Sequence, residues 1–421
     1  MDIKSICSII EQRQDELFEL LSSLIKINSE SFGSYGNEEE CARYIKSLCD
    51  GLGLETDMYS PLDLPGFADN EDYFPGRGLE NRYNVVARYR GEENVDELML
   101  MAHSDTVMIG DRANWSFDPL SGRIADGKIY GRGAGDDKYA IATVLFIMKL
   151  LREYGYVPNK NIVFAAYSDE EYGGSHGAMA AVMKYPTNRI VSMDGREGQI
   201  WNCGSGGGEL KYHFHSAGVV DSAKSVALAL PVVIDVINEF AEARFTELDN
   251  NRFYHGSAIP TTSLRYMGVR AGNNGMDLDR GEVYFVFYTD KTKEEIYREL
   301  DVIDAKIKER LLPLGMIGDG FSAPTRFFHY VFCEQDSEDV LLMREASREA
   351  TGDDLDVVGS CLSDLSVISY HGNSRAFGFG AGRDFSMVGG AHQPNEFIEC
   401  DKLVNYAKTI ATYIIKVLGE G

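Results

Sequence analysis

The sequence lacks the cysteine pattern of a disulfide-stabilised or zinc-finger protein. Its seven cysteines are scattered, odd in number and contain no CxxC pair. Such spacing favours free thiols in a reducing compartment, where cysteine serves as a small buried apolar side chain. We therefore expect a cytoplasmic protein.

Positive charge and long apolar runs are also scarce. The chain has 41 Lys and Arg residues against 66 Asp and Glu residues, a net charge of −25. Nucleic acids and anionic membranes bind clustered Lys and Arg, so both are excluded as partners. No apolar run is long enough to span a bilayer, and we expect no signal peptide before the first helix. The expected partner is a small molecule.

The chain is longer than a single hydrophobic core usually supports. With 421 residues and 44% hydrophobic content, it is expected to form two domains. Hydrophobic periodicity predicts these elements in the first half of the chain: a helix at 3–27, a helix from Glu38 to Gly51, a surface insertion at 61–80, neighbouring strands at 83–89 and 98–102, a helix at 139–154, and strands at 161–167 and 190–193.

A histidine and a carboxylate end the apolar strand expected at 98–102. His103 and Asp105 lie two residues apart, so on extended chain they point the same way. The Asp105 carboxylate can then accept the imidazole N–H and leave the other nitrogen for a metal. Taken singly, the pair is more typical of a satisfied core histidine, and only further ligands elsewhere in the chain favour a metal.

A glycine-rich turn precedes the helix expected at 139–154. Asp126 to Lys138 reads DGKIYGRGAGDDK, whose glycines allow a tight strand-to-helix turn. Such a loop can bind phosphate at a helix N-terminus. However, Asp136 and Asp137 would repel phosphate, and the GKS/T and GxGxxG patterns are both missing. A metal is the better interpretation.

Further potential ligands lie at other predicted strand ends and in a glycine loop. Asp169, Glu170 and Glu171 come directly after the strand at 161–167, and three adjacent acids need a cation or a shared proton to offset their repulsion. Asp194 ends the next strand, and His392 lies in the loop GGAHQPNE. Together with His103 and Asp136, these side chains form a ligand set for two zinc-like ions that share one carboxylate.

The order of these motifs resembles one enzyme family across nearly the whole chain. HxDxV, DGKIYGRGAxDDK, DEExG, a later Asp and AHxxNE are similar to the dinuclear zinc hydrolases that include acetylornithine deacetylase, succinyl-diaminopimelate desuccinylase, aminoacylase and carboxypeptidase G. The resemblance implies two divalent ions per subunit, with zinc expected first and manganese or cobalt as alternatives.

The resemblance also implies a role for each site residue. His103 and Asp194 would hold one metal, Glu171 and His392 the other, and Asp136 would bridge the two. Asp105 would orient His103, while Glu170 would be the general base that activates the attacking water. In the family, the peptide bond between the two residues matching Asp136 and Asp137 is cis.

The middle of the chain is expected to form an inserted domain. Residues 206–313 predict the order strand (209–216), helix (222–243), strand (262–270), strand (282–288) and helix (293–311). This order suits an α+β lid with an antiparallel sheet and helices on one face. Residues 1–205 and 314–421 would form the α/β catalytic domain, a mixed, mostly parallel sheet flanked by helices. In the family this lid often dimerises, so a homodimer or higher homo-oligomer is expected.

The sequence departs from the family where the substrate would bind. The lid histidine expected after Gly218 is replaced by VVDS, and the lid strand at 283–290 lacks the arginine that commonly binds a substrate carboxylate. The candidate replacements are His213, His215, Asn274, His255, Arg265, Arg270, Arg280 and Arg383. Arg383 can instead form an ion pair with Asp384. Of these, we retain Arg383, His215 and Asn274 as substrate candidates.

These observations favour hydrolysis of a C–N bond. The first hypothesis is cleavage of an amide bond in a small peptide or N-acyl amino acid. The second keeps the metals and the base but acts on a carbamoyl, aryl-amide or arylamine bond. The third is a catalytically silent binding protein, which has no chemical need for Glu170 beside the ligand Glu171.

Overall fold

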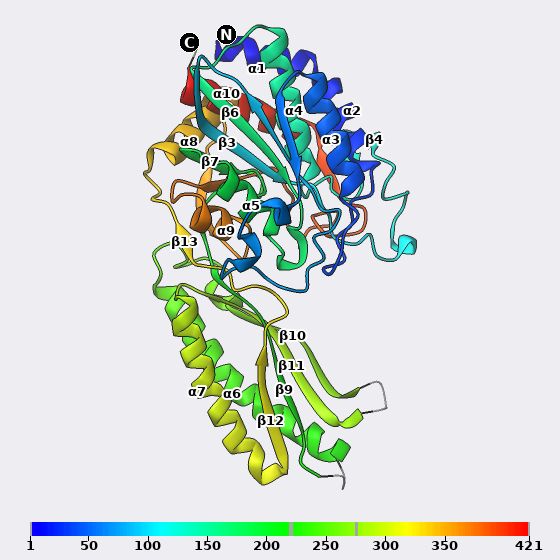
Figure 1. Cartoon of the computed structure of the whole chain (residues 1–421), viewed down its shortest axis with the longest axis vertical. Helices are drawn as coiled ribbons and strands as arrows, with labels where there is room; N and C mark the ends of the chain where they lie inside the picture. Colours follow the sequence, from blue (N-terminus) through cyan, green and yellow to red (C-terminus); the bar gives the residue numbers. More distant parts are fainter. Residues whose placement is uncertain (1, 219–221, 274–276, 420–421) are drawn as a thin grey trace. The chain divides into compact units, whose positions relative to one another are not determined.

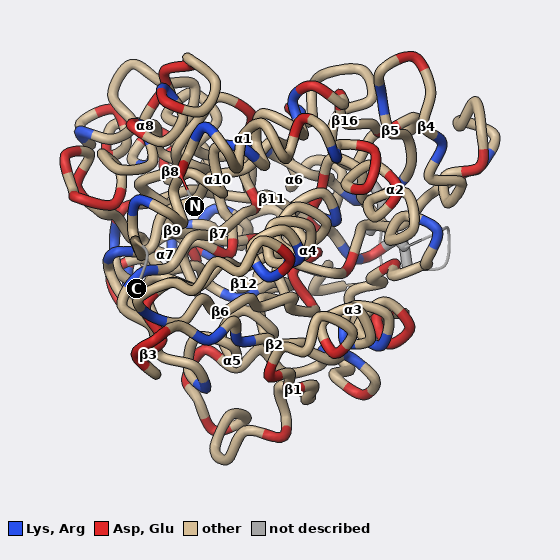
Figure 2. The backbone as a smooth tube through the Cα atoms, turned by 90° about the horizontal axis from the view of Figure 1, so that it is seen from above, with Lys and Arg blue, Asp and Glu red and all other residues tan. Residues whose placement is uncertain are grey.

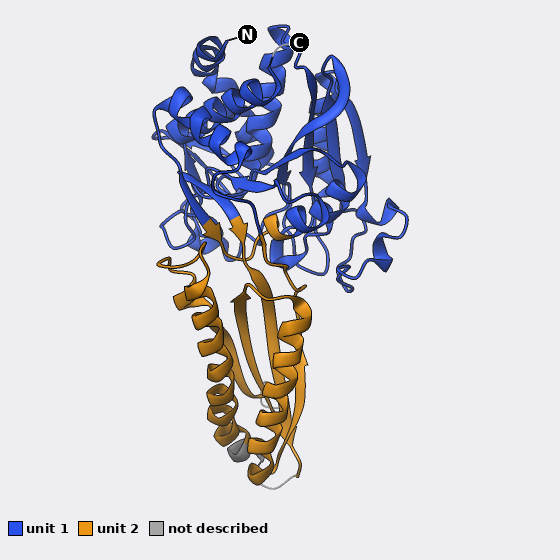
Figure 3. Ribbon diagram, turned by 90° about the vertical axis from the view of Figure 1, so that its left-hand side faces the viewer, with its two compact units in different colours: residues 1–202, 332–358, 367–421 blue, residues 203–331, 359–366 orange. Residues whose placement is uncertain are grey.

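The computed structural model describes residues 2–218, 222–273 and 277–419, and these residues form two compact units. Unit 1 comprises residues 1–202, 332–358 and 367–421, and unit 2 comprises residues 203–331 and 359–366 (Figure 3). Lys and Arg are interspersed with Asp and Glu along the chain (Figure 2). Among the described helices, none combines the length and apolar character needed to cross a membrane.

Unit 1 is built on a nine-stranded mixed sheet with helices packed around it (Figure 1). The main strand order is β1-β2-β6-β3-β7-β15-β8-β13, and β14 also pairs with β8. The strands of this sheet are β1 (Glu55–Tyr59), β2 (Asn84–Tyr89), β3 (Glu93–His103), β6 (Lys160–Tyr167), β7 (Arg189–Ser192), β8 (Gln199–Gly204), β13 (Val331–Phe332), β14 (Asp356–Ser360) and β15 (Phe377–Phe379). The pairs around β3, β6 and β7 are parallel, whereas β1 with β2 and β2 with β6 are antiparallel. The expected α/β class is confirmed.

The helices of unit 1 are α1 (Ile3–Gln12), α2 (Gln14–Ile25), α3 (Glu39–Gly51), α4 (Lys138–Glu153), α5 (His176–Lys184), α8 (Glu338–Thr351), α9 (Leu365–His371) and α10 (Cys400–Leu418). Helix α4 is buried over most of its length because its sequence is apolar on nearly every face. The helix expected at 3–27 is two helices, since Arg13 leaves helical geometry (φ −113°, ψ 18°) and pairs with Glu16 and with Glu153 of α4.

Two expectations for unit 1 are wrong. The strands at 83–89 and 98–102 are not neighbours, because β6 lies between β2 and β3. The second half of β3, from Leu98, and most of β6 are apolar on both faces and buried, whereas β2 carries the partly exposed Arg88 and lies further out. The segment 61–80 is not only a surface insertion, since Phe67, Arg77 and Leu79 are buried.

Unit 2 is a four-stranded antiparallel sheet with two long helices. The strand order is β10-β11-β9-β12, and the elements are β9 (Gly206–Ser216), α6 (Ser222–Asn250), β10 (Leu264–Asn273), β11 (Asp277–Thr289), α7 (Lys293–Leu311) and β12 (Met316–Ser322). Both helices lie along the sheet (Figure 1), and their apolar residues share one core with it. The expected α+β class is confirmed, although α6 is longer than expected.

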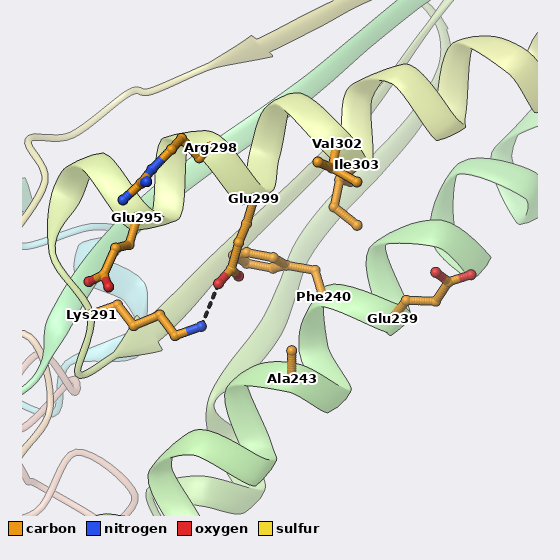
Figure 4. Close-up of a pocket in the computed structure, with 9 residues that line it drawn as sticks. All are labelled: Glu239, Phe240, Ala243, Lys291, Glu295, Arg298, Glu299, Val302 and Ile303. Carbon is orange, nitrogen blue, oxygen red and sulfur yellow. Dashed lines mark hydrogen bonds and ion pairs between the residues drawn. The ribbon is translucent and has the colours of Figure 1, made fainter.

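The boundaries of the inserted domain differ from the expected 206–313. Unit 2 continues to Val331 because β12 pairs with β9 and extends the sheet, with the Phe321 ring against Tyr212 at 4.8 Å between centroids. Helices α6 and α7 border a surface cavity of about 500 Å³ (Figure 4). Phe240 and Ala243 of α6 line it together with Val302 and Ile303 of α7, and the remaining lining residues are charged. This cavity contains none of the expected metal ligands.

Candidate metal centre

Three parallel strands deliver polar residues to one edge of the unit 1 sheet. In the register of β3 and β6, His103 pairs with Tyr167, and in that of β3 and β7, Met101 pairs with Ser192. The residues that come after β6 and β7, Glu170, Glu171 and Asp194, therefore emerge beside His103. Catalytic groups of open α/β sheets collect at this carboxyl edge.

A small second sheet brings the other two expected ligands together. Strand β5 (Lys128–Tyr130) precedes the glycine-rich turn, and β16 (Phe397–Glu399) comes after the loop of His392. The two strands pair antiparallel, and β4 (Arg123–Ala125) completes the sheet on the other side of β5. This pairing places the turn that ends in Asp136 next to the loop that contains His392.

Glu396 joins these two loops from within. One of its carboxylate oxygens accepts the backbone N–H groups of Gly133 (3.1 Å) and Gly135 (2.7 Å), and the other pairs with the buried Arg132. The Arg132 guanidinium also lies over the Trp115 ring at 5.2 Å. Glu396 stood in the motif AHxxNE, but sequence reasoning assigned it no role, because its partners are more than 250 residues away.

The Asp136 carboxylate lies between the two histidines. Its Oδ1 is 2.8 Å from Nε2 of His103, and its Oδ2 is 3.1 Å from Nε2 of His392. His392 Nε2 also lies 3.3 Å from Oε2 of Glu171, whose Oε1 accepts the Val107 N–H at 2.9 Å. The bond between Asp136 and Asp137 is cis, as the resemblance implied. One carboxylate thus faces two imidazoles through separate oxygens.

These donors form two overlapping sets that could each hold a metal ion. His103, Glu170 and Glu171 have ligand atoms within 4.8 Å of one another, and so do Asp136, Glu171 and His392. Asp194 lies close enough to the second set for its pKa to be changed by Asp136. Burial raises the pKa of Asp194 to about 7, and the negative charge of Asp136 adds to that rise. Imidazole nitrogens and carboxylate oxygens of this kind fit zinc and related divalent ions.

The electrostatics of the cluster favour a cation. Although burial alone lowers the pKa of His392, the charge of Glu171 and the hydrogen bond to Asp136 raise it to about 11. For His103, burial also lowers the pKa, but Asp105 and Asp136 raise it well above the usual value. The negative charge of these carboxylates therefore favours a positive charge at both rings, and a divalent ion would supply the same compensation.

Asp105 contacts His103 differently from the expected arrangement. Nδ1 of His103 lies 2.9 Å from the backbone carbonyl oxygen of Asp105, while the Asp105 carboxylate is farther away at 3.7 Å. That carboxylate instead accepts the backbone N–H groups of Glu170 and Glu171, each at 3.1 Å. Asp105 therefore links the histidine to the segment that carries the expected general base.

Asp169 is neutralised by arginine rather than by a metal. Arg77 and Arg82 both donate to its Oδ1, and Nδ1 of the buried His176 lies 2.6 Å from its Oδ2. Burial by itself raises the pKa of Asp169, but His176 and the two arginines lower it to about 2. For Asp169, the first of the three adjacent acids, two guanidinium groups supply the positive charge.

Arg77 was missed by sequence reasoning because it lies in the expected surface insertion. Besides Asp169, it donates to the backbone carbonyls of Glu171 (2.7 Å) and Tyr172 (3.2 Å). Phe67 and Leu79, on either side of Arg77 in the sequence, are buried. Their apolar side chains were the sequence signal that this segment packs inward. The segment 61–80 thus supports the loop that comes after β6.

The substrate candidates already have protein partners. Arg383 pairs with Glu399 at 3.2 Å and covers the Phe397 ring, whereas Asp384, its expected alternative partner, pairs with Arg196. In unit 2, Nδ1 of His215 lies 2.9 Å from Asp319. The other unit 2 histidines considered from the sequence are also paired, His213 with Ser322 and His255 with the Asp249 carbonyl. Asn274 lies outside the described residues.

Solved structures share the fold over nearly the whole chain. The dipeptidase Dug1p from Saccharomyces cerevisiae superposes with a TM-score of 0.75 at 15% identity, covering 99% of this chain and 98% of that chain. Human carnosine dipeptidase 1 gives a TM-score of 0.70 at 15% identity, with 99% and 98% coverage. At such low identity, these similarities establish the fold.

Sequence comparison adds relatives that match part of the chain and relatives that match nearly all of it. A metallohydrolase of Methanococcus maripaludis is 31% identical over 43% of this chain, and the match spans 42% of that protein's length. The N-formyl-4-amino-5-aminomethyl-2-methylpyrimidine deformylase of Halalkalibacterium halodurans is 22% identical over 98% of this chain and 96% of its own length. The sequence profile of Peptidase family M20/M25/M40 matches residues 99–416, which include every expected metal ligand. The chain therefore belongs to Peptidase family M20/M25/M40.

Proposed function

We propose that this protein is a metal-dependent hydrolase that uses a dinuclear centre to cleave an amide bond in a small peptide or N-acyl amino acid. The observation that carries the proposal is the Asp136 carboxylate, which presents one oxygen to His103 and the other to His392. A carboxylate placed between two imidazoles in this way suits a ligand shared by neighbouring ions.

The proposed ligands divide into two sets around this carboxylate. His103 and Asp194 would hold one ion, Glu171 and His392 the other, and Asp136 both. Zinc is the first candidate, and manganese or cobalt would suit the same oxygen-rich donors. When bound, the two ions would polarise the scissile carbonyl and lower the pKa of water.

Glu170 is the proposed general base. Its carboxylate belongs to the set with His103 and Glu171, and its backbone N–H is fixed by the Asp105 carboxylate. From this position it would take a proton from the attacking water and pass it to the leaving nitrogen. This role also argues against a silent binding protein, which would not need a positioned base.

A second candidate is a non-peptide C–N bond on a compact molecule. A relative that aligns along almost the full chain is named as the deformylase of a substituted pyrimidine, which supports this second candidate. Another relative, from Wigglesworthia glossinidia brevipalpis, is named as a succinyl-diaminopimelate desuccinylase, which fits the first candidate, an N-acyl amino acid. The absence of the usual lid histidine and arginine motifs from this sequence supports keeping both substrate classes open.

The oligomer and the compartment are part of the same proposal. The edge strand β10 exposes Tyr266, Met267 and Val269, a surface that another copy of the chain could cover to form a homodimer. All seven cysteines are free thiols, which is compatible with a reducing, cytoplasmic compartment.

The test is turnover together with metal content. The protein is loaded with Zn, Mn or Co and assayed on N-acyl amino acids, dipeptides, and carbamoyl and aryl amides. Glu170→Gln should abolish turnover while the metal content stays near that of the wild type. No turnover by a protein shown to hold two ions would overturn the proposal, and loss of metal from the variant would remove Glu170 as the base.

A further inference from the structure

Three large apolar side chains are exposed directly beside the candidate metal ligands. Met108 and Tyr172 are 45% and 40% exposed, and Phe385 is 45% exposed. They come from three separate segments of unit 1, after β3, β6 and β15. A group of large apolar side chains exposed close together often marks a binding site, whereas a single exposed apolar residue does not. We call these three residues the apolar rim.

Each member of the rim is tied to a candidate ligand. The Phe385 ring packs against the His392 ring, with 4.8 Å between centroids. Tyr172 directly follows Glu171, and its hydroxyl accepts the Met108 N–H at 3.3 Å. Met108 in turn follows Val107, whose N–H binds the Glu171 carboxylate. Each rim residue therefore lies next to Glu171 or His392, through a ring contact or through the adjoining backbone.

The rim is also held in place by its surroundings. Tyr172 has a left-handed backbone (φ 59°), which is unfavourable for a bulky residue, and its carbonyl is bound by Arg77. Gln393 donates its side-chain N–H to the Phe385 carbonyl at 3.0 Å. These contacts hold the backbone at Tyr172 and at Phe385 beside the ligand loops.

The cations around the same loops are already bound to protein groups. The residues concerned, with their partners, are Arg77 and Arg82 with Asp169, Arg132 with Glu396, Lys138 with the Leu24 and Ile27 carbonyls, Arg196 with Asp384, and Arg383 with Glu399. A charged acyl group placed over the rim would lose water without gaining a cation from these residues, which costs free energy. An apolar group meets no such cost.

We propose that the substrate carries an uncharged, apolar acyl group and that Met108, Tyr172 and Phe385 contact it. The proposal rests on the proposed amide hydrolysis and names its substrate class. Glu170 must reach the leaving nitrogen, so the amine half lies on the side of Glu170 and His103, and the acyl group extends away from it. Phe385 packs on His392, which belongs to the ligand set without Glu170, whereas Met108 and Tyr172 adjoin Glu171, which belongs to both sets.

The experiment uses the metal-loaded full chain and four substrates with one amine, N-acetyl-, N-hexanoyl-, N-phenylacetyl- and N-succinyl-alanine. The hexanoyl and phenylacetyl compounds should exceed the acetyl compound in kcat/KM by about tenfold, since each buried methylene favours binding, and the succinyl compound should be poorest. A preference for succinyl, or equal rates for all acyl groups, would overturn the inference while leaving amide hydrolysis intact. No hydrolysis of any compound would overturn the proposed function as well.

Variants then locate the preference. Tyr172→Ser and Met108→Ser should lower kcat/KM for hexanoyl- and phenylacetyl-alanine about tenfold more than they lower it for acetyl-alanine. Tyr154→Ser is the matched control, because Tyr154 is 52% exposed at the end of α4, away from the ligands. Phe385→Ala is assayed together with metal content, since its ring touches His392. Equal losses on every acyl group, or a preference that follows the amine when the amine is varied, would contradict the assignment.

Discussion

Arg77 binds Asp169 through two nitrogens, with Nη2 at 2.6 Å and Nε at 3.0 Å from the same carboxylate oxygen. Both side chains are buried, so the pair is not screened by water. Because Nη2 of Arg77 also binds the Glu171 carbonyl, this ion pair holds the backbone of the segment that carries Glu170 and Glu171. An arginine outside the ligand set therefore fixes the loop of the proposed base.

Replacing Arg77 by Met should lower both stability and turnover. The variant keeps the apolar stem but leaves two carbonyls and part of the Asp169 charge without a partner, at a cost of about 2 to 3 kcal/mol in unfolding free energy. We expect kcat to fall more than the metal content, because the ligands themselves remain. Urea unfolding and elemental analysis measure the two effects.

The matched control for this change is Arg43→Met. Arg43 forms an exposed ion pair with Glu39 on α3, and such pairs contribute less than about 1 kcal/mol. Equal losses of stability in the two variants would contradict a special role for Arg77.

The stability of the protein should depend on pH through Asp169. Its folded pKa of about 2 lies below the ordinary carboxyl value, so its contribution is complete above pH 4 and is lost as the pH falls toward 2. The shift corresponds to roughly 2 kcal/mol. The stability difference between the wild type and Asp169→Asn should therefore be largest near pH 7 and shrink below pH 4, as measured by urea unfolding at several pH values. A difference that does not change with pH would show that Asp169 is not held ionised in this way.

The local elements and the identity of the clustered residues could be predicted from the sequence. The apolar run before His103 and the acids after Tyr167 are local signals, and the structure places these residues at one sheet edge. The sheet order could not be predicted in the same way. The position of β6 between β2 and β3 depends on which strands bury both faces, and this becomes visible only when all the strands compete for the centre.

The ion pairs that support the ligand loops could not be predicted from the sequence, for a related reason. Arg77 and Asp169 are 92 residues apart, and Arg132 and Glu396 are 264 residues apart. One sequence shows no sign of which charge will meet which, since the periodicity of a strand or helix constrains only its near neighbours. For the same reason the Asp105 carboxylate was assigned to His103, although in the structure it binds backbone N–H groups.

Removing the Asp136 charge should empty the centre. Asp136→Asn keeps the size of the side chain but offers one neutral oxygen in place of a shared carboxylate, so we expect the metal content to fall by at least one ion per chain. Metal addition should then raise the melting temperature of the variant less than that of the wild type, because ligand binding stabilises only the state that binds. Asp126→Asn is the control, since Asp126 lies in the turn before β5, outside the ligand set. Unchanged stoichiometry would remove Asp136 as the bridge.

Glu396, which links the Asp136 turn to the His392 loop, should be as important for metal binding as the ligands themselves. Glu396→Gln keeps an oxygen for the Gly133 and Gly135 N–H groups but leaves the buried Arg132 without its counter-charge, which costs about 3 kcal/mol. Weaker metal binding should accompany this loss, because the Asp136 turn and the His392 loop are no longer held together. The double variant with Arg132→Met should recover part of the stability, whereas Glu92→Gln, at an exposed position, should change little. Full additivity of the two single changes would contradict a direct coupling.

The proposed dimer makes its own prediction for unit 2. Strand β10 is an edge of the four-stranded sheet and exposes Met267 (53%) and Val269 (51%), so its backbone can pair with the same strand of another copy. A lysine at Met267 or Val269 would bring two like charges together across a two-fold interface and should give monomers in light scattering at micromolar concentration. Strand β12 is the opposite edge and exposes Ile317 (45%), which makes Ile317→Lys the matched control. If Ile317→Lys dissociates the oligomer and the β10 variants do not, the interface lies on the other edge. If the wild type is itself a monomer, the exposed β10 residues serve another purpose.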